Sequence, residues 1–568
     1  MLRILYGTAG TGKSAAIMDE IRRGADSGER YILLVPEQYS HEAERELCAV
    51  CGDGLSLYAE VLSFTGLARE ISSECGGAAN EYLDKGGRLL CMALAADGLY
   101  SRLRVYGAAW RKAELQTMLL GAVDEFKSAC VTSEQLLDAA ETCEGALGDK
   151  LHDLGLILEA YDGVVANGRA DPSDRLSVLA QQVGQCSMNE RTHVFVDGFT
   201  DFTAQERRVL EALLLKGVRL TVCLGCDELH GGSEVFALSR ITASALLKFA
   251  ADNGVKAQTE RREGESTKAK PLGEFCENMF SYRAVEAGDA EDRIKIISAA
   301  DMNAECEFAA AEAVSLVRDT GCRWRDIAVC AKGFDDYRLP LESAFSRFGA
   351  PIYTARKADM LSKPLPMLIE SAYEIILGGW EADDVFDYLR TGFGGLDTDE
   401  CDELENYVFM WQLHGSAWTR AENWRLHPEG YGKQPDEASE QTLEHINLLR
   451  ETARRPLMRF AENAAAATTA TEQAQALASL FEDLHLADKL QARAEELEKD
   501  GRASAAQEYA QLWDITVGAL EQCAAVLGDT PADAEYFGRL FSLMLSRYDI
   551  GTIPASLDCV TAGEMDRM

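Results

Sequence analysis

A glycine-rich segment close to the amino terminus has the residue types and the spacing of a phosphate-binding loop. It reads Gly7-Thr8-Ala9-Gly10-Thr11-Gly12-Lys13-Ser14, which matches the pattern G-x-x-x-x-G-K-S. Glycine allows a tight turn and a close approach to a ligand, so that successive backbone N–H groups can surround phosphate oxygens. Lys13 would neutralise the outer phosphates, and the Ser14 hydroxyl would bind Mg²⁺. We therefore predict that these residues hold a nucleoside triphosphate together with Mg²⁺.

A carboxylate follows a second apolar run that predicts a buried strand. The run His193–Val196 leads directly into Asp197, which would hold Mg²⁺ through its water shell, opposite Ser14. Hydrolysis normally requires a further carboxylate at the next position, to orient and deprotonate the attacking water. That position is Gly198, and the next acid is Asp201, several residues into the turn. We predict a site that binds a nucleotide and cleaves it poorly, and we assign no catalytic residue. The alternative is that Asp197 only caps a turn.

Two C-x-x-C pairs could form a different kind of site. One pair is Cys48 with Cys51, and the other is Cys223 with Cys226, with His230 nearby. Together they could make a zinc site. The first pair lies in a helical pattern and the second at the end of a predicted buried strand, where free cysteines more often act as small hydrophobic residues. Zinc binding is therefore the weaker interpretation.

The predicted elements around the loop are those of a strand–helix–strand unit. An apolar run at Leu2–Tyr6 predicts a buried strand, and helical apolar spacing follows over Ala15–Ile21. Further strands are predicted at Tyr31–Val35 and Val218–Leu224. This order is typical of a parallel α/β domain, in which the carboxyl ends of the strands present residues to a ligand. The predicted fold class is therefore α/β.

The composition is that of an ordinary globular protein with a strong negative charge. The chain has 568 residues, with 56 Lys and Arg against 94 Asp and Glu, which gives a formal net charge of −38. This acidity argues against a protein coated in nucleic acid, but it does not exclude a local basic groove. No apolar run reaches the ~18–20 residues of a membrane helix. The segment from Met1 to Gly7 enters a turn too early for a signal peptide, so we expect none. The 16 cysteines are then expected to be reduced thiols in a cytosol.

Hydrophobic patterning divides the chain into α/β segments and helical segments. In the second α/β segment, strands are predicted at Ile294–Ile297 and Asp326–Cys330, with a helix at Glu305–Arg318 between them. A polar stretch from about 255 to 290 is predicted to be a linker. The predicted domains are 1–79 with 166–285 (nucleotide binding), 80–165 (helical insertion), 286–362 with 546–568 (second α/β domain, incomplete) and 363–545 (second helical insertion).

The helical segments contain apolar and aromatic residues that suit a core. Leu477, Leu480, Phe481 and Leu484 have the spacing of one helix face, which predicts core packing. Aromatic residues such as Phe64, Tyr407 and Trp411 could stack on bases. At helical spacing an aromatic side chain more often belongs to the core, which is the interpretation we favour.

The arrangement of the domains resembles a known class of motor proteins. Two α/β domains that each carry a helical insertion, with a phosphate loop in the first, resemble UvrD-type superfamily 1 helicases, which implies two RecA-like domains. Shorter motifs narrow the resemblance to the AddB family. They are Leu33-Leu34-Val35-Pro36-Glu37-Gln38, Val196-Asp197-Gly198-Phe199-Thr200-Asp201-Phe202-Thr203, Leu389-Arg390-Thr391-Gly392, Leu404-Glu405-Asn406-Tyr407 followed by Trp418, and Ile553-Pro554-Ala555-Ser556-Leu557-Asp558.

The resemblance implies a function in the processing of DNA ends. AddB is the helicase-like, non-motor subunit of the bacterial AddAB helicase–nuclease, and it pairs with the AddA motor subunit at double-strand DNA ends. The complex unwinds and degrades DNA, then responds to a Chi sequence and leaves a 3′ single strand for homologous recombination. ATP with Mg²⁺ at the phosphate loop, single-stranded DNA, a cytoplasmic location and no membrane are the corresponding expectations.

The resemblance also implies what this segment does not carry. In the AddB family, a nuclease with a four-cysteine 4Fe–4S cluster follows the helicase-like part. The residues that match its cluster and its metal site are expected beyond Met568, with the second α/β domain cut before its end. We therefore expect neither nuclease activity nor an iron–sulfur cluster from these 568 residues.

Departures from an active helicase agree with the prediction of poor hydrolysis. Gly198 stands where helicases have the catalytic Glu, and the loop after Gly225 lacks the glutamine that senses the outer phosphate. Lys332 stands where active relatives have an arginine, whose planar fork a lysine does not reproduce. Two alternatives remain open: an autonomous ATP-driven single-stranded DNA translocase, and a small-molecule kinase with a phosphate loop.

Overall fold

The computed structural model describes residues 1–52, 54–76, 82–166, 169–263, 272, 274–275, 294–354, 357–551 and 558–565. These residues form two compact units, the first comprising Met1–Leu83, Gly98–Trp110 and Thr117–Ile296, and the second the remainder of the chain. The domain boundaries predicted from the sequence stay predictions. The motif residues Ile553–Leu557, the predicted linker from 264 onward (apart from isolated positions) and the chain end at 566–568 lie outside the described residues.

The first unit is built on a six-stranded sheet with the order β3-β2-β4-β5-β1-β6, in which every pair of neighbours is parallel. This confirms the predicted α/β class with a parallel sheet. The strands are β1 (Leu2–Gly7), β2 (Arg30–Leu34), β3 (Ala59–Leu62), β4 (Thr192–Val196), β5 (Arg219–Gly225) and β6 (Ala257–Arg261).

The helices of the first unit connect these strands and extend from them. They are α1 (Lys13–Arg23), α2 (Ser40–Cys51), α3 (Phe64–Cys75), α5 (Ala113–Ser128), α6 (Ser133–Thr142), α7 (Ala146–Val165), α8 (Arg175–Gln182), α9 (Ala204–Leu215) and α10 (Ala237–Asp252). Two helices, α4 (Lys85–Leu99) and α5, contain residues of both compact units.

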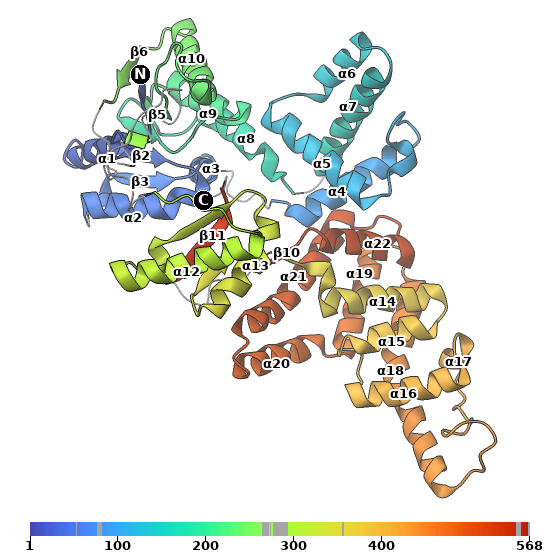
Figure 1. The fold of residues 1–568 in the computed structure, drawn as a ribbon. Coiled ribbons are helices and arrows are strands. Elements are labelled where there is room, and N and C mark those ends of the chain that lie inside the picture. The colour runs from blue at the N-terminus through green and yellow to red at the C-terminus, as the bar shows by residue number, and fades with distance from the viewer. Residues whose placement is uncertain are drawn as a thin grey trace. The chain divides into compact units, whose positions relative to one another are not determined.

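Both faces of the large sheet are buried, because side chains alternate between them along each strand. The helices α1 and α2 lie along one face of the sheet (Figure 1). On this face Leu5, Leu33 and Phe195 pack against apolar residues of the two helices. On the other face the next residues along the same strands, among them Ile4 and Leu34, pack against α3, α8, α9 and α10. The strands β1, β2, β4 and β5 therefore read as apolar runs in the sequence, and their predicted positions are confirmed to within two residues.

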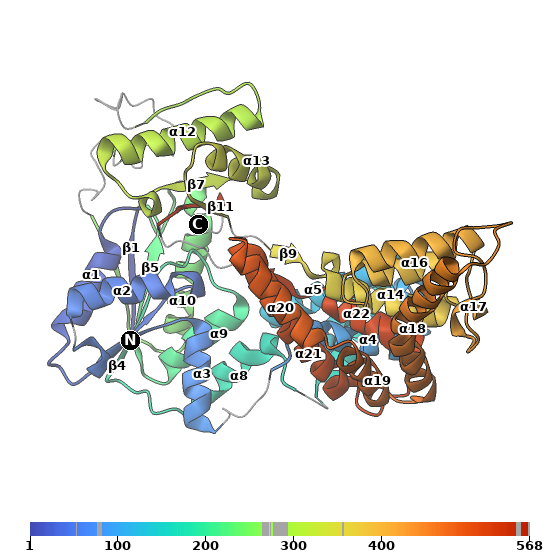
Figure 2. The same ribbon diagram turned by 90° about the horizontal axis from the view of Figure 1, so that it is seen from below.

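A smaller parallel sheet lies in the second unit. Its strands have the order β7-β11-β8, with β7 (Ala328–Ala331), β8 (Ile352–Thr354) and β11 (Val560–Glu564). The helices α12 (Met302–Thr320) and α13 (Phe334–Arg347) lie beside β7 and β11 (Figure 2). They contribute Ala310 and Phe345 to the hydrophobic core at this sheet. The short strands β9 (Lys357–Asp359) and β10 (Asp549–Gly551) form an antiparallel pair.

The rest of the second unit is helical. Its helices are α14 (Pro364–Gly378), α15 (Ala382–Arg390), α16 (Thr398–Trp411), α17 (Ser416–Thr419), α18 (Glu437–Ala466), α19 (Ala470–Asp483), α20 (Leu486–Lys499), α21 (Ala503–Leu527) and α22 (Ala534–Leu545). The stripe Leu477, Leu480, Phe481 and Leu484 is buried, as predicted. Tyr407 is buried too and stacks on Trp424, with ring centroids 5.5 Å apart, so it belongs to the core.

Two expectations for the segment that joins the units were wrong. Ile294–Ile297 forms no strand: Ile296 is 96% exposed, and the run has no neighbouring strand with which to share backbone hydrogen bonds in the described residues. The stretch predicted as a polar linker contains the edge strand β6, which pairs with β1. The side chains of this edge strand are largely exposed, so its sequence needs no apolar pattern. Without an apolar pattern, the strand could not be recognised from the sequence. Among the described helices, none combines the length and the apolar character needed to cross a membrane.

Candidate nucleotide-binding site

The predicted phosphate loop connects the end of β1 to the start of α1. Gly7 is the last residue of β1, and Lys13 is the first residue of α1. Gly10 and Gly12 have φ values of 84° and 73°, in the left-handed region that residues with a Cβ rarely adopt. At Gly7, a Cβ would lie 2.7 Å from the carbonyl oxygen of Arg262, so only glycine fits there. The glycines predicted from the motif are thus required by the backbone.

The amino end of α1 is open to an anion. All of α1 is described, and its amino end has neither a side-chain cap nor an acidic residue in the first turn. A Cβ at Gly12 would meet no atom within 4 Å, so space lies in front of the loop, and Ser14 is exposed beside it. Free N–H groups at the positive end of the helix dipole favour a phosphate or carboxylate.

The Lys13 ammonium is held at the loop by backbone carbonyls. Its Nζ donates hydrogen bonds to the oxygens of Gly7 (2.8 Å) and Thr8 (2.7 Å), and the Thr11 hydroxyl also donates to the Thr8 oxygen (2.9 Å). Burial lowers the pKa of Lys13, and the nearby Cys223 and Asp197 partly oppose this shift. A phosphate would supply the negative charge that two neutral carbonyls do not.

Asp197 reaches the same edge of the sheet because of the strand order. β5 lies between β4 and β1, with Val196 beside Val222 and Leu5 beside Cys223. Asp197, which follows Val196, therefore lies next to Cys223. The negative charge of Asp197 raises the pKa of Lys13 and so opposes part of the effect of burial. The carboxylate is half-buried and accepts a hydrogen bond from the Gly198 N–H (3.0 Å).

Cys223 also lies at this candidate site, although the sequence analysis had considered it only as part of a C-x-x-C pair. Burial, followed by the charge of Asp197, raises the pKa of the Cys223 thiol, so the group stays neutral. Its partner in the C-x-x-C pair, Cys226, is buried and donates to the Glu228 oxygen (3.0 Å). Within the described ranges, no group of three or more His, Cys, Asp or Glu side chains could hold a metal ion, so the zinc interpretation gains no support.

Gly198 is unsuited to the carboxylate that its position would need. Its φ is 83°, and a Cβ there would lie 3.2 Å from Cδ of Pro36. The next acid, Asp201, is exposed. A residue with a Cβ at this position would therefore be strained and would crowd Pro36.

We predict that Gly198→Glu does not create ATP hydrolysis and that it destabilises the protein. Positive φ at a residue with a Cβ costs on the order of 1–3 kcal/mol. Thermal unfolding and phosphate release measure the two effects. The matched control is Gly121→Glu in α5, where the position is exposed and a Cβ would have open space. Efficient hydrolysis by the Gly198→Glu variant would contradict this account of the site.

At the small sheet, the amino end of α13 is capped by a carboxylate of the chain itself. Gly333 precedes α13, and the Glu564 carboxylate accepts hydrogen bonds from the N–H groups of Gly333 (3.0 Å) and Phe334 (2.8 Å). Lys332, at the end of β7, is exposed. The chain's own carboxylate thus takes the place that a phosphate could occupy, which no sequence pattern had indicated.

Comparisons with known proteins show that the chain is similar to one family over its whole length. The profile of the family described as "ADDB, N-terminal" matches residues 4–273. Proteins named as the B-type subunit of an ATP-dependent helicase/deoxyribonuclease are similar over the full chain: 30% identical in Acetivibrio thermocellus, 31% in Caldanaerobacter subterraneus and 33% in Desulforudis audaxviator. The matches cover 100% of this chain and 50%, 50% and 51% of those relatives. The chain therefore spans about half the length of the curated relatives it matches.

Proposed function

Because the chain belongs to the AddB family, whose N-terminal part it matches, we propose that it is a helicase-like, non-motor subunit of an AddAB-type helicase–nuclease. In this proposal it pairs with an AddA-type motor subunit at double-strand DNA ends and contributes to Chi-regulated resection. Its relatives are named as subunits, which supports a partner. The two parallel sheets, one with a phosphate loop, support a pair of RecA-like domains of the UvrD type.

The chemistry proposed for the first sheet is ATP binding with weak or no hydrolysis. Residues Gly7 to Ser14 would hold the phosphates, and Ser14 with Asp197 would hold Mg²⁺, which neutralises phosphate charge when bound. The open helix end and the half-buried Lys13 ammonium fit such a ligand. The observation that carries the proposal is that Lys13 follows β1 and Asp197 follows β4, at the carboxyl ends of two strands on either side of β5, while Gly198 stands directly after Asp197.

Phosphate release with and without single-stranded DNA tests this proposal against an autonomous translocase. We expect the purified protein to bind Mg-ATP saturably and to release phosphate at a rate that single-stranded DNA does not raise. A missing positioned base typically costs about 10²–10⁴-fold in rate. The same assay with an AddA-type partner present should show DNA-dependent turnover that belongs to the partner. DNA-stimulated turnover by the protein alone would favour the translocase.

A further inference from the structure

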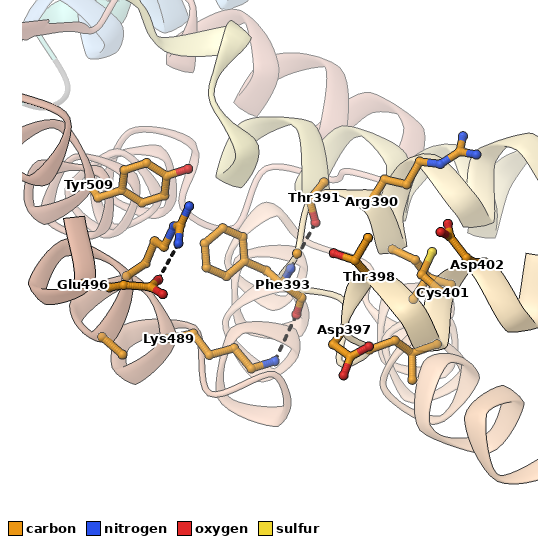
Figure 3. Close-up of a pocket in the computed structure, with 15 residues that line it drawn as sticks. Arg390, Thr391, Phe393, Asp397, Thr398, Cys401, Asp402, Lys489, Glu496 and Tyr509 are labelled. Carbon is orange, nitrogen blue, oxygen red and sulfur yellow. Dashed lines mark hydrogen bonds and ion pairs between the residues drawn. The ribbon is translucent and has the colours of Figure 1, made fainter. Parts of the chain in front are cut away.

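A cavity in the helical part of the second unit is lined by a motif that the proposed function does not use. The cavity has a volume of about 760 Å³, a size at which pockets hold small ligands. One wall contains Leu389 and Arg390, the last residues of α15, with Thr391 and Gly392 in the turn that follows. Residues of α20 and α21 form another wall (Figure 3). None of these residues belongs to the phosphate loop.

The wall formed by the motif is a fixed turn with open space beside it. The Thr391 hydroxyl donates to the Tyr388 oxygen (2.7 Å) and accepts from the Phe393 N–H (3.3 Å). Gly392 has a φ of 80°, and a Cβ there would meet no atom within 4 Å. The backbone is therefore held in place by its own side chains, while a ligand can approach it closely at Gly392.

The cavity contains a cation without a matching anion. Lys489, in α20, is half-buried, and its Nζ donates to the Phe393 carbonyl oxygen at 3.1 Å, as Figure 3 shows. Burial lowers the pKa of Lys489. Within the described part of the chain, no carboxylate lies at ion-pair distance from this ammonium. A half-buried charge with only a neutral partner is costly, and an added anion would relieve that cost.

The other charges at the cavity are already matched or in solvent. Glu496 pairs with Arg493, and Arg390 pairs with Glu405 outside the lining. The Asp397 carboxylate caps α16 by accepting the Glu400 N–H at 2.9 Å. Asp402, the remaining acid of the lining, is exposed. Lys489 is thus the charge that a ligand would meet.

Two aromatic side chains also line this cavity. Phe393, in the turn, is buried, and Tyr509, in α21, is half-buried, with both rings on the same side of the cavity in Figure 3. A planar base can stack on such a ring. We propose that this cavity binds one nucleotide unit, with its phosphate at Lys489 and its base against Tyr509. The unit could be a free mononucleotide or part of a single DNA strand, and the proposal does not rest on the function proposed above.

Direct binding measurements in a Lys13→Ala background test the cavity without interference from the phosphate loop. Inorganic phosphate, thymidine monophosphate and a 5′-phosphorylated oligothymidylate are titrated calorimetrically. We expect Lys489→Met to weaken thymidine monophosphate at least about tenfold, because a hydrogen bond to a charged group is lost. Lys489→Arg should keep much of the affinity. The matched control is Lys499→Met, an exposed lysine in the same helix, which should change nothing.

The outcomes separate the sources of the ligand and can overturn the proposal. Tighter binding of the oligothymidylate assigns the cavity to a DNA strand, and tighter binding of the monophosphate assigns it to a free nucleotide. Equal affinity with and without Lys489→Met, no saturable binding, or inorganic phosphate binding as tightly as the nucleotide overturns it. A second measurement uses the unmutated protein: thymidine monophosphate, and not thymidine, should protect Lys489 from acetylation detected by mass spectrometry.

Discussion

Lys13→Ala is expected to reduce the affinity for Mg-ATP at least about a hundredfold, because hydrogen bonds to charged groups contribute on the order of 1.5–3 kcal/mol each. The Lys13 ammonium is held at the loop by two carbonyl oxygens and faces the end of α1, where a triphosphate would lie. Isothermal titration with Mg-ATP measures the loss. If the unmutated protein and the Lys13→Ala variant bound Mg-ATP with equal affinity, the assignment of this loop to phosphate binding would be wrong.

The same variant separates binding from folding. Burial lowers the pKa of Lys13. In the protein without ligand, the charged ammonium is therefore less favourable than it would be in water. The free protein should therefore keep its thermal stability when Lys13 becomes alanine. Lys248→Ala, an exposed lysine in α10, is the matched control and should affect neither affinity nor stability. A fall in the unfolding temperature with Lys13→Ala alone would indicate a structural role for this side chain.

Lys127 is a buried cation in the first unit, and it contacts one buried and two half-exposed carboxylates. Its Nζ lies 2.9 Å from Asp162, 3.0 Å from Asp171 and 2.7 Å from Asp174. Tyr161 donates a hydrogen bond to the Asp171 carboxylate (3.0 Å), and Asp171 is only 2% exposed. Burial alone would lower the pKa of Lys127, but the hydrogen bond to Asp174 and the charge of Asp171 raise it overall. The cluster joins α5 and α7 to the segment before α8.

Lys127→Met is expected to lower the free energy of unfolding by about 3–5 kcal/mol, because it leaves the buried Asp171 carboxylate without its counter-charge. Urea unfolding at neutral pH measures the change. The raised pKa means that the contribution of Lys127 is complete below the ordinary lysine value and is lost only as the pH rises through its own value.

Two further variants define the origin of this loss. Lys150→Met, at an exposed lysine of α7, is the matched control and should cost little. Adding Asp171→Asn to Lys127→Met should recover part of the stability, because the amide needs no counter-charge. A loss below about 1 kcal/mol for Lys127→Met would show that water or neighbouring groups replace the ammonium.

Local patterns in the sequence were sufficient to predict four strands of the large sheet and the glycine-rich turn that follows the first of them. The residues from Gly7 to Ser14, the buried strand before them and Asp197 after another strand follow from spacing and apolar runs, because the parallel sheet is buried on both faces. The stripe from Leu477 to Leu484 was found in the same way. Where that pattern was weak or misleading, at β6 and at Ile294–Ile297, the prediction failed.

The tertiary structure alone decided which distant residues meet. Cys223 lies between the glycine-rich loop and Asp197 of the candidate nucleotide site because β5 inserts between β4 and β1. The Glu564 carboxylate accepts a hydrogen bond at the amino end of α13 from Phe334, which lies 230 positions earlier in the chain. Lys489 reaches the carbonyl of Phe393 across 96 positions. Such contacts depend on strand order and helix packing, which local propensity and spacing do not encode, whereas the loop, its glycines and its lysine are contained in one continuous segment.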